Sequence, residues 1–147
     1  MRLQDINVSG FTIHKINKVL TIPPKLSTTA LDSNLTAAAG ALIETDLVGT
    51  LDVAKDLTIF VPNNEAFQLA GSAFANASVE TLKSVLQYHA VVGSVVFSQD
   101  ISNGTILPLS GQPIVVNVVD GSIFVNHAKV VLPNVLLANG VAHVIDT

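Results

Sequence analysis

An apolar run rich in β-branched and aromatic residues, Leu57–Val61, ends at Pro62 and predicts a buried strand. Proline cannot donate to a sheet ladder, so the strand is expected to stop there. Asn63 or Asn64 can then cap a helix through a side-chain oxygen, and Glu65 lies in the first turn, where a negative charge suits the helix dipole. This stretch therefore encodes a core strand, a sharp stop and a capped helix.

The segments before this strand show two further patterns. Alternating apolar residues from Ile16 to Ile22 predict a strand, which Pro23-Pro24 ends. One helix is predicted over Leu26–Leu42, with Ser27 as its cap. Its buried stripe is expected to comprise Leu31, Leu35, Ala38 and Leu42.

Two more helices are predicted. A short helix over Asp46–Val53 places apolar residues inward, and Ser78 caps another helix that ends near Tyr88. The inward residues of the first are Leu47, Val48 and Leu51, and those of the second are Val79, Leu82, Val85 and Leu86.

Beyond Val91 the pattern changes to short strands separated by turn residues. Asp120-Gly121 is a strong hairpin signal, because both residues tolerate positive φ. Helices first and a strand meander later predict an α+β fold. The expected strands are Val95–Phe97, Thr105–Leu109, Ile114–Val119, Ser122–Val125, Lys129–Leu132, Val135–Ala138 and Val141–Ile145.

Composition narrows the classes of function. The 147 residues include 49% hydrophobic and only 12% charged residues, which argues for a packed core and against disorder. The net charge of −4 argues against nucleic acid as a partner. The sequence has no uninterrupted apolar run long enough for a membrane span and no cysteine, which excludes disulfides and thiol catalysis. No cofactor is expected.

The end of the chain repeats a pattern from its beginning. His143-Val144-Ile145-Asp146 resembles His14-Lys15-Ile16-Asn17, and each segment follows a glycine turn, with a one-residue difference in spacing. We interpret both as the same strand of two consecutive modules.

Three segments together resemble fasciclin (FAS1) domains. Leu57–Phe67 is similar to a first family signature of the form TVFAPTNEAF, 86–93 resembles the Tyr-His segment of the family, and 139–146 resembles its second signature. The resemblance covers roughly Leu26 to Thr147. It implies a compact β-sandwich of short strands with helices packed along one side, in tandem modules of secreted or cell-surface adhesion proteins. The signature residues with an expected structural role are Phe60, Pro62, Asn64, Phe67, Asn139, Gly140, His143 and Asp146.

The resemblance also implies a division of the chain. Residues 1–24 are similar to the tail strand and linker of a preceding module, and residues 25–147 form a fasciclin domain without its own final Val-Leu-x-Pro tail. An open apolar edge invites strand pairing. We therefore expect the N-terminal segment to occupy the vacant strand position in its own molecule or in a neighbour, the latter forming a homodimer through strand 11–22.

The candidate site is Tyr88-His89, since the resemblance implies an integrin contact there. The alternative, which we favour, is that Tyr88 packs and His89 hydrogen-bonds a backbone group just past the helix. His143 and Asp146 offer no catalytic triad, because the sequence lacks a nucleophile elbow. No His-x-His or His-Glu-x-x-His spacing predicts a metal site.

The predicted function is a non-catalytic extracellular adhesion or matrix-interaction module. Its expected partners are a matrix or cell-surface protein, or a cell-wall polysaccharide. The alternatives are a module that binds a polysaccharide or a small ligand and, third, a hydrolase. Four N-glycosylation sequons point to secretion or the cell surface, with a GPI anchor as one option for a longer precursor. They begin at Asn7, Asn34, Asn76 and Asn103.

Overall fold

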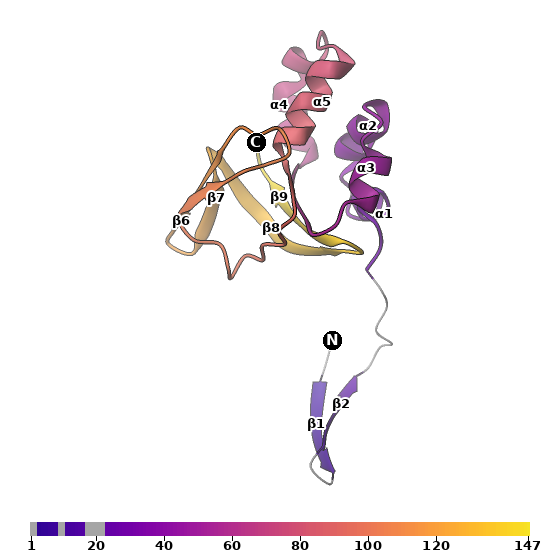
Figure 1. Cartoon of the computed structure of the whole chain (residues 1–147), viewed down its shortest axis with the longest axis vertical. Helices are drawn as coiled ribbons and strands as arrows, with labels where there is room; N and C mark the ends of the chain where they lie inside the picture. Colours follow the sequence, from indigo (N-terminus) through magenta and orange to yellow (C-terminus); the bar gives the residue numbers. More distant parts are fainter. Residues whose placement is uncertain (1–2, 9–10, 17–22) are drawn as a thin grey trace.

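The computed structural model describes residues 3–8, 11–16 and 23–147, with side chains from residue 23 onward. Helices precede a strand meander, which confirms the predicted α+β class (Figure 1). Seven strands form one mixed sheet in the order β4-β3-β9-β8-β7-β6-β5. Their bounds are β3 (Leu57–Pro62), β4 (Ala90–Val92), β5 (Gly104–Ile106), β6 (Ile114–Val119), β7 (Ser122–Val125), β8 (Ala128–Leu137) and β9 (Gly140–Ile145).

The sheet is antiparallel except between β3 and β9, which run parallel next to the edge strand β4. The sheet also bends, because β8 carries register shifts between Val130 and Leu132 and between Leu132 and Val135. Beyond β5, the Leu109 N–H donates to the Ala90 carbonyl of β4 at 2.6 Å. The two ends of the sheet therefore meet, and they enclose a core between them.

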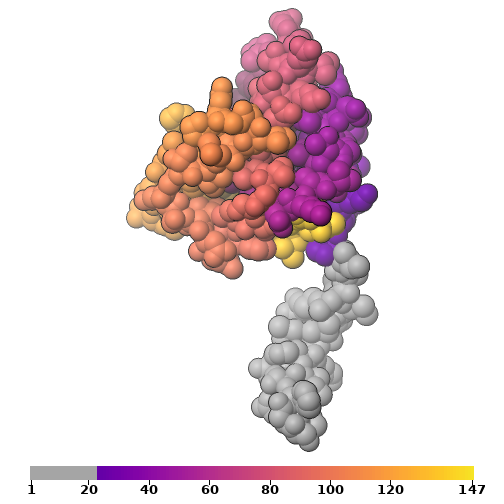
Figure 2. Space-filling model, viewed as in Figure 1, coloured from indigo at the N-terminus to yellow at the C-terminus, as the bar shows by residue number. Residues whose placement is uncertain are grey.

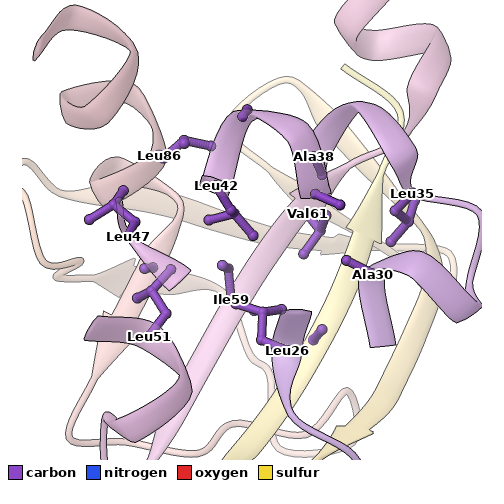
Figure 3. Packing of buried hydrophobic residues seen from close by; sticks show 14 of the residues in the cluster. Leu26, Ala30, Leu35, Ala38, Leu42, Leu47, Leu51, Ile59, Val61 and Leu86 are labelled. Carbon is purple, nitrogen blue, oxygen red and sulfur yellow. The ribbon is translucent and has the colours of Figure 1, made fainter. Parts of the chain in front are cut away.

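The strand β3 is buried on both faces, which explains why its residues are apolar apart from Thr58. Ile59 and Val61 face the helices, where they join a core with Leu42, shown in Figure 3. Phe60 points to the opposite side and joins a second core between the two halves of the sheet. This second core also contains Val91, Ile114, Val116, Val125, Ala128, Val130 and Ile145.

Five helices cover one face of β3 and β9, and Figure 2 shows them beside the orange strand region. Asn63 and Ser78 cap two of these helices by accepting hydrogen bonds from Ala66 N and Thr81 N, as predicted. The bounds are α1 (Leu26–Asp32), α2 (Thr36–Glu44), α3 (Val48–Val53), α4 (Asn64–Phe74) and α5 (Val79–Tyr88).

The single helix predicted over Leu26–Leu42 is wrong. The chain forms α1 and α2 with a break at Asn34, whose φ of 58° is left-handed. Ser27 does not cap α1, because its backbone N–H and its hydroxyl both donate to the Asp52 carboxylate. Leu31 leaves the predicted stripe and is exposed, whereas Leu35, Ala38 and Leu42 are buried. In the other two helices Leu47 and Leu51 are buried as predicted, but Val79 is exposed.

The strand predictions are confirmed for β6 and β7, and Asp120 and Gly121 both have positive φ in the turn between them. Lys129–Leu132 and Val135–Ala138 are parts of one longer strand, β8, because both pair with β9 across its bulges. Thr105–Leu109 shortens to β5, and Val95–Phe97 is a loop. The short strand β4 was not predicted.

The N-terminal strands β1 (Leu3–Val8) and β2 (Phe11–Ile16) form a separate antiparallel hairpin. β1 was not predicted from the sequence. Within the described residues, β2 pairs with β1 and not with the seven-stranded sheet. Residues 17–22 of the strand predicted over Ile16–Ile22 lie outside the described residues.

Candidate functional site at the end of α5

Tyr88 ends α5 and joins it to the second half of the sheet. Its hydroxyl donates to the Pro113 carbonyl at 3.2 Å and accepts from Asn126 Nδ2 at 2.8 Å. The ring is only partly buried, and it packs beside the core that contains Phe60. Tyr88 therefore anchors the β6–β7 region to α5, and part of its own ring remains exposed to solvent.

His89 follows directly, and its Nδ1–H donates to the Val85 carbonyl of α5 at 2.7 Å. The structure thus places a backbone hydrogen bond where the sequence predicted one. Because Nδ1 carries the proton, Nε2 of the neutral ring is an acceptor, and it has no hydrogen-bond partner among the described residues. Burial lowers the pKa of His89, and the bond to the Val85 carbonyl partly offsets that shift.

His89 lies in the wall between two cavities, and Thr147 borders both. The helix-side cavity measures about 120 Å³ and is almost wholly apolar. The sheet-side cavity, about 190 Å³, lies over the core between the halves of the sheet. The helix residues that line the first cavity are Ala66, Phe67, Ala70, Phe74, Leu82, Val85 and Leu86, and the lining of the second includes Phe60, Tyr88, Asn126, His127 and Ile145.

His143 has a different environment and is fully buried. Its Nε2–H donates to the Val96 carbonyl at 2.8 Å, Nδ1 accepts from the Asn134 N–H at 3.2 Å, and its ring stacks on Phe60 with centroids 5.6 Å apart. Burial lowers the pKa of His143, and the bond to Val96 partly offsets the shift. With both nitrogens bonded to backbone groups, this histidine has no free acceptor for acid–base chemistry.

The other residues of the second signature bind the protein backbone. Asn139 donates from Nδ2 to the carbonyls of Leu51 and Ala54, at 2.8 and 2.6 Å, so it ties the end of α3 to the β8–β9 turn. A methyl group on Gly140 would overlap the Leu57 carbonyl of the parallel strand. Asp146 accepts from the Lys129 N–H at 2.8 Å.

The first signature likewise forms connections within the fold. Asn64 does not cap α4; its Oδ1 accepts from the Ala37 N–H and its Nδ2 donates to the Asn34 carbonyl, so it holds the start of α2. Phe67 lies in the helix-side cavity, 6.1 Å from Phe74 between ring centroids. Pro62 lies at the end of β3 opposite Ile145.

A loop of residues 94–98 was missed by sequence reasoning, although three side chains hold it. Thr58 donates to the Ser94 carbonyl and accepts from the Val96 N–H, while Asn134 and His143 bind Ser98 and Val96. The predicted strand over Val95–Phe97 fails for this reason, because its backbone groups bond to side chains instead of another strand. The signal available in the sequence was a buried threonine within an apolar run.

The chain offers accessible sequons. Asn34, Asn76 and Asn103 are exposed, although Asn103 Oδ1 accepts from the Val118 N–H. The side chain of Asn7 lies outside the described ones. Within residues 23–147, no group of three or more His, Asp or Glu residues is placed to hold a metal ion. None of the helices in the described part of the chain has the length and apolar character needed to cross a membrane.

These segments define the class of the protein. Residues 33–147 match the model of the Fasciclin domain family, so the chain belongs to that family. Its fold is similar to part of a FAS1 domain pair from the insect cell adhesion molecule Fasciclin I, with a TM-score of 0.70 at 20% identity, over 97% of this chain and 56% of that one.

Relatives come from distant organisms. A fasciclin-like arabinogalactan protein of Arthroderma benhamiae is 37% identical over 141 residues, which is 96% of this chain and 34% of that protein. Protein sll1483 of Synechocystis is 36% identical over 78% of this chain and 64% of its own length. Stabilin-2 of Mus musculus is 33% identical over 89% of this chain and 6% of its length. The chain therefore spans about a third of the first relative.

Proposed function

We propose that this chain is a non-catalytic extracellular module that binds a matrix or cell-surface component. The observation that carries the proposal is the family match over 33–147, which includes all three segments that resembled the family in sequence. A structural relative is described as a cell adhesion molecule, and a fungal relative as an arabinogalactan protein. The exposed sequons support a secreted or cell-surface location, with GPI anchoring as one way to hold a longer protein there.

The binding surface we propose is centred on Tyr88 and His89. Tyr88 borders the sheet-side cavity and a shallow hollow of about 400 Å³ that also involves Ser84, Gln87 and Gln112. A partly exposed aromatic ring held by two hydrogen bonds suits a contact residue, because little side-chain entropy remains to be lost on binding. The expected partner is a protein or cell-wall polysaccharide that inserts polar groups beside this ring.

The experiment is a binding screen by surface plasmon resonance against matrix proteins and cell-wall polysaccharides, with glycosylated and unglycosylated chain. Tyr88→Ala is expected to weaken the binding that the parent chain shows by at least about tenfold, the loss typical of an anchor residue. Leu69→Ala is the control, since Leu69 is 77% exposed on α4 and lines neither cavity. Equal binding by both variants, or no binding by the parent chain, would contradict the proposal.

Catalysis is tested separately with generic ester and glycoside substrates. We expect no turnover above background, because His143 uses both nitrogens and, among the described residues, no serine or threonine hydroxyl is hydrogen-bonded to Nε2 of His89. Turnover that His89→Asn abolishes would instead favour a hydrolase.

A small-ligand module is the second candidate, and the apolar helix-side cavity of about 120 Å³ favours it. A ligand that binds there would raise the melting temperature and shift the His89 ring resonances in NMR spectra, while those of His143 stay fixed.

A further inference from the structure

The sequon at Asn76 lies in a tight turn that begins with an aromatic residue. The Ala77 N–H donates to the Phe74 carbonyl at 3.0 Å, and Ala75 has φ −56° and ψ −28°, as the second residue of a type I turn does. Asn76 is the third residue of this turn and is exposed, at the top of Figure 1. Its Cα lies at most about 7 Å from that of Phe74. Of the four sequons, only this one has an aromatic residue two positions before the asparagine.

Phe74 also lines a hollow that opens beside the turn. The hollow measures about 330 Å³ and lies between α2 and the α4–α5 pair. Phe74, Ala77 and Val79 line it on the side of the turn, and the Val79 side chain is 49% exposed. Thr36 and Glu44 add polar groups on the side of α2. A pyranose ring has a face of C–H groups and a rim of hydroxyls, so this mixed lining suits a sugar.

The hydroxyl of this sequon is part of the folded structure. Ser78 Oγ accepts from the Thr81 N–H at 3.2 Å and lies 3.0 Å from Thr81 Oγ1, so Ser78 caps α5. A glycosylating enzyme reads this hydroxyl together with the asparagine, and transfer to the sequon therefore precedes the capping of α5. The first sugar is then already attached when α4, the turn and α5 pack together.

We propose that Asn76 carries an N-linked glycan whose first N-acetylglucosamine packs on Phe74 and Val79 and covers this hollow. In the transfer, Asn76 Nδ2 bonds to the anomeric carbon of an oligosaccharide held on a lipid diphosphate. The bond from that carbon to the diphosphate breaks, the lipid diphosphate leaves, and the amide nitrogen gives up one proton to solvent. The modification rests on the secreted or cell-surface location in the proposed function.

The first sugar lies away from the proposed binding surface. Asn76 precedes the start of α5, whereas Tyr88 ends this helix. Ten helical residues at a rise of 1.5 Å each separate the two ends by about 15 Å. The glycan is therefore expected to change the stability of the chain without contacting the ring of Tyr88.

The test compares two preparations of the 147-residue chain. One is secreted from a eukaryotic host behind a cleavable signal peptide and trimmed by an endoglycosidase to a single N-acetylglucosamine at each occupied site. The other is made in bacteria without glycans. Mass spectrometry is expected to find Asn76 modified in most secreted molecules. Asn76→Gln is expected to lower the melting temperature of the trimmed chain by about 4 °C and that of the bacterial chain by less than about 2 °C.

Asn103→Gln is the matched control for a sequon without such a hollow. Its Oδ1 accepts from the Val118 N–H at 2.6 Å, and this bond changes in both preparations alike. The shift in melting temperature is therefore expected to be the same in both. An unmodified Asn76 in the secreted chain, or equal shifts for Asn76→Gln in the two preparations, would overturn the inference.

A second measurement locates the sugar without any variant of the ring. In NMR spectra of the trimmed chain, nuclear Overhauser contacts are expected between the Phe74 ring protons and the C–H protons of the sugar on Asn76. Their absence would show that this sugar stands in solvent, and the inference would fail. Because the signal peptide imposes secretion, neither result depends on the adhesion function. A glycosylated chain that binds nothing in the plasmon resonance screen would contradict only the proposed function.

Discussion

His143 and His89 differ in how many of their ring nitrogens form hydrogen bonds within the protein. His143 is fully buried, and hydrogen bonds to Val96 and Asn134 occupy both of its ring nitrogens. His89 bonds only one carbonyl, that of Val85, and lies between two cavities. Burial lowers the pKa of both, so a shifted pKa alone does not distinguish a structural histidine from a candidate site. The free Nε2 acceptor of His89 and its position between two cavities make that distinction.

The largest effect is expected where the strand of His143 meets β3. Gly140→Ala would place a methyl group against the Leu57 backbone, within 2.6 Å of its carbonyl carbon, and neither strand can move without breaking the core. We expect a loss of more than about 3 kcal/mol in the free energy of unfolding. Urea denaturation measures it.

Gly71→Ala is the matched control for that substitution. Gly71 lies within α4, where a methyl group would meet nothing within 4 Å, so alanine is expected to stabilise by about 0.5–1 kcal/mol. A loss below about 1 kcal/mol for Gly140→Ala would show that β9 can shift, and that the environment of His143 is less rigid than its hydrogen bonds indicate.

The next effect compares the two histidines directly. His143→Ala leaves the Val96 carbonyl and the Asn134 N–H without this partner and removes the ring stacked on Phe60, so we expect a loss of about 2–4 kcal/mol. His89→Ala removes one hydrogen bond beside an existing cavity and is expected to cost about 1 kcal/mol. Chemical denaturation of both variants checks the order. Equal losses would mean that His89 is also a core residue.

Local signals in the sequence were enough to predict much of the fold. The β3 stretch, the Asn63 and Ser78 caps and the Asp120-Gly121 turn were predicted, because each depends on residues within a few positions of one another. The break between α1 and α2 was missed, since Asn34 adopts a left-handed conformation that periodicity does not reveal. Merging two predicted strands into β8 required β9 as the common partner.

The candidate site was predictable only in part. The hydrogen bond from His89 Nδ1–H to the Val85 carbonyl was predicted from the place of this residue just past the end of a helix. The contact between Tyr88 and Asn126 joins residues 38 positions apart, and the cavities collect side chains from helices and strands. No local pattern encodes such an arrangement, because it depends on how the sheet closes against the helices.

The smallest effect is the pH dependence of stability, and it sharpens the comparison. Both folded pKa values are lowered, so below the ordinary value of about 6.5 the unfolded chain binds protons that the folded chain does not. The contribution of the two neutral histidines to the free energy of unfolding is therefore fully present above this pH, and it is lost as pH falls from 6.5 towards the folded pKa values. Melting temperatures between pH 7.5 and 5.0 measure this loss, which is expected to be smaller in each single-histidine variant than in the parent chain.

The variants for this test keep the hydrogen bond that each neutral ring donates to a backbone carbonyl. His89→Asn supplies an amide N–H where Nδ1–H donates to Val85, and His143→Gln supplies one where Nε2–H donates to Val96. We expect His143→Gln to remove more of the pH dependence, because a charge on that ring would be fully buried and would lose its bond from the Asn134 N–H. A protonated His89 can still reach water through the cavities that it borders. If His89→Asn instead removed more of the pH dependence, the stronger coupling between protonation and folding would belong to His89.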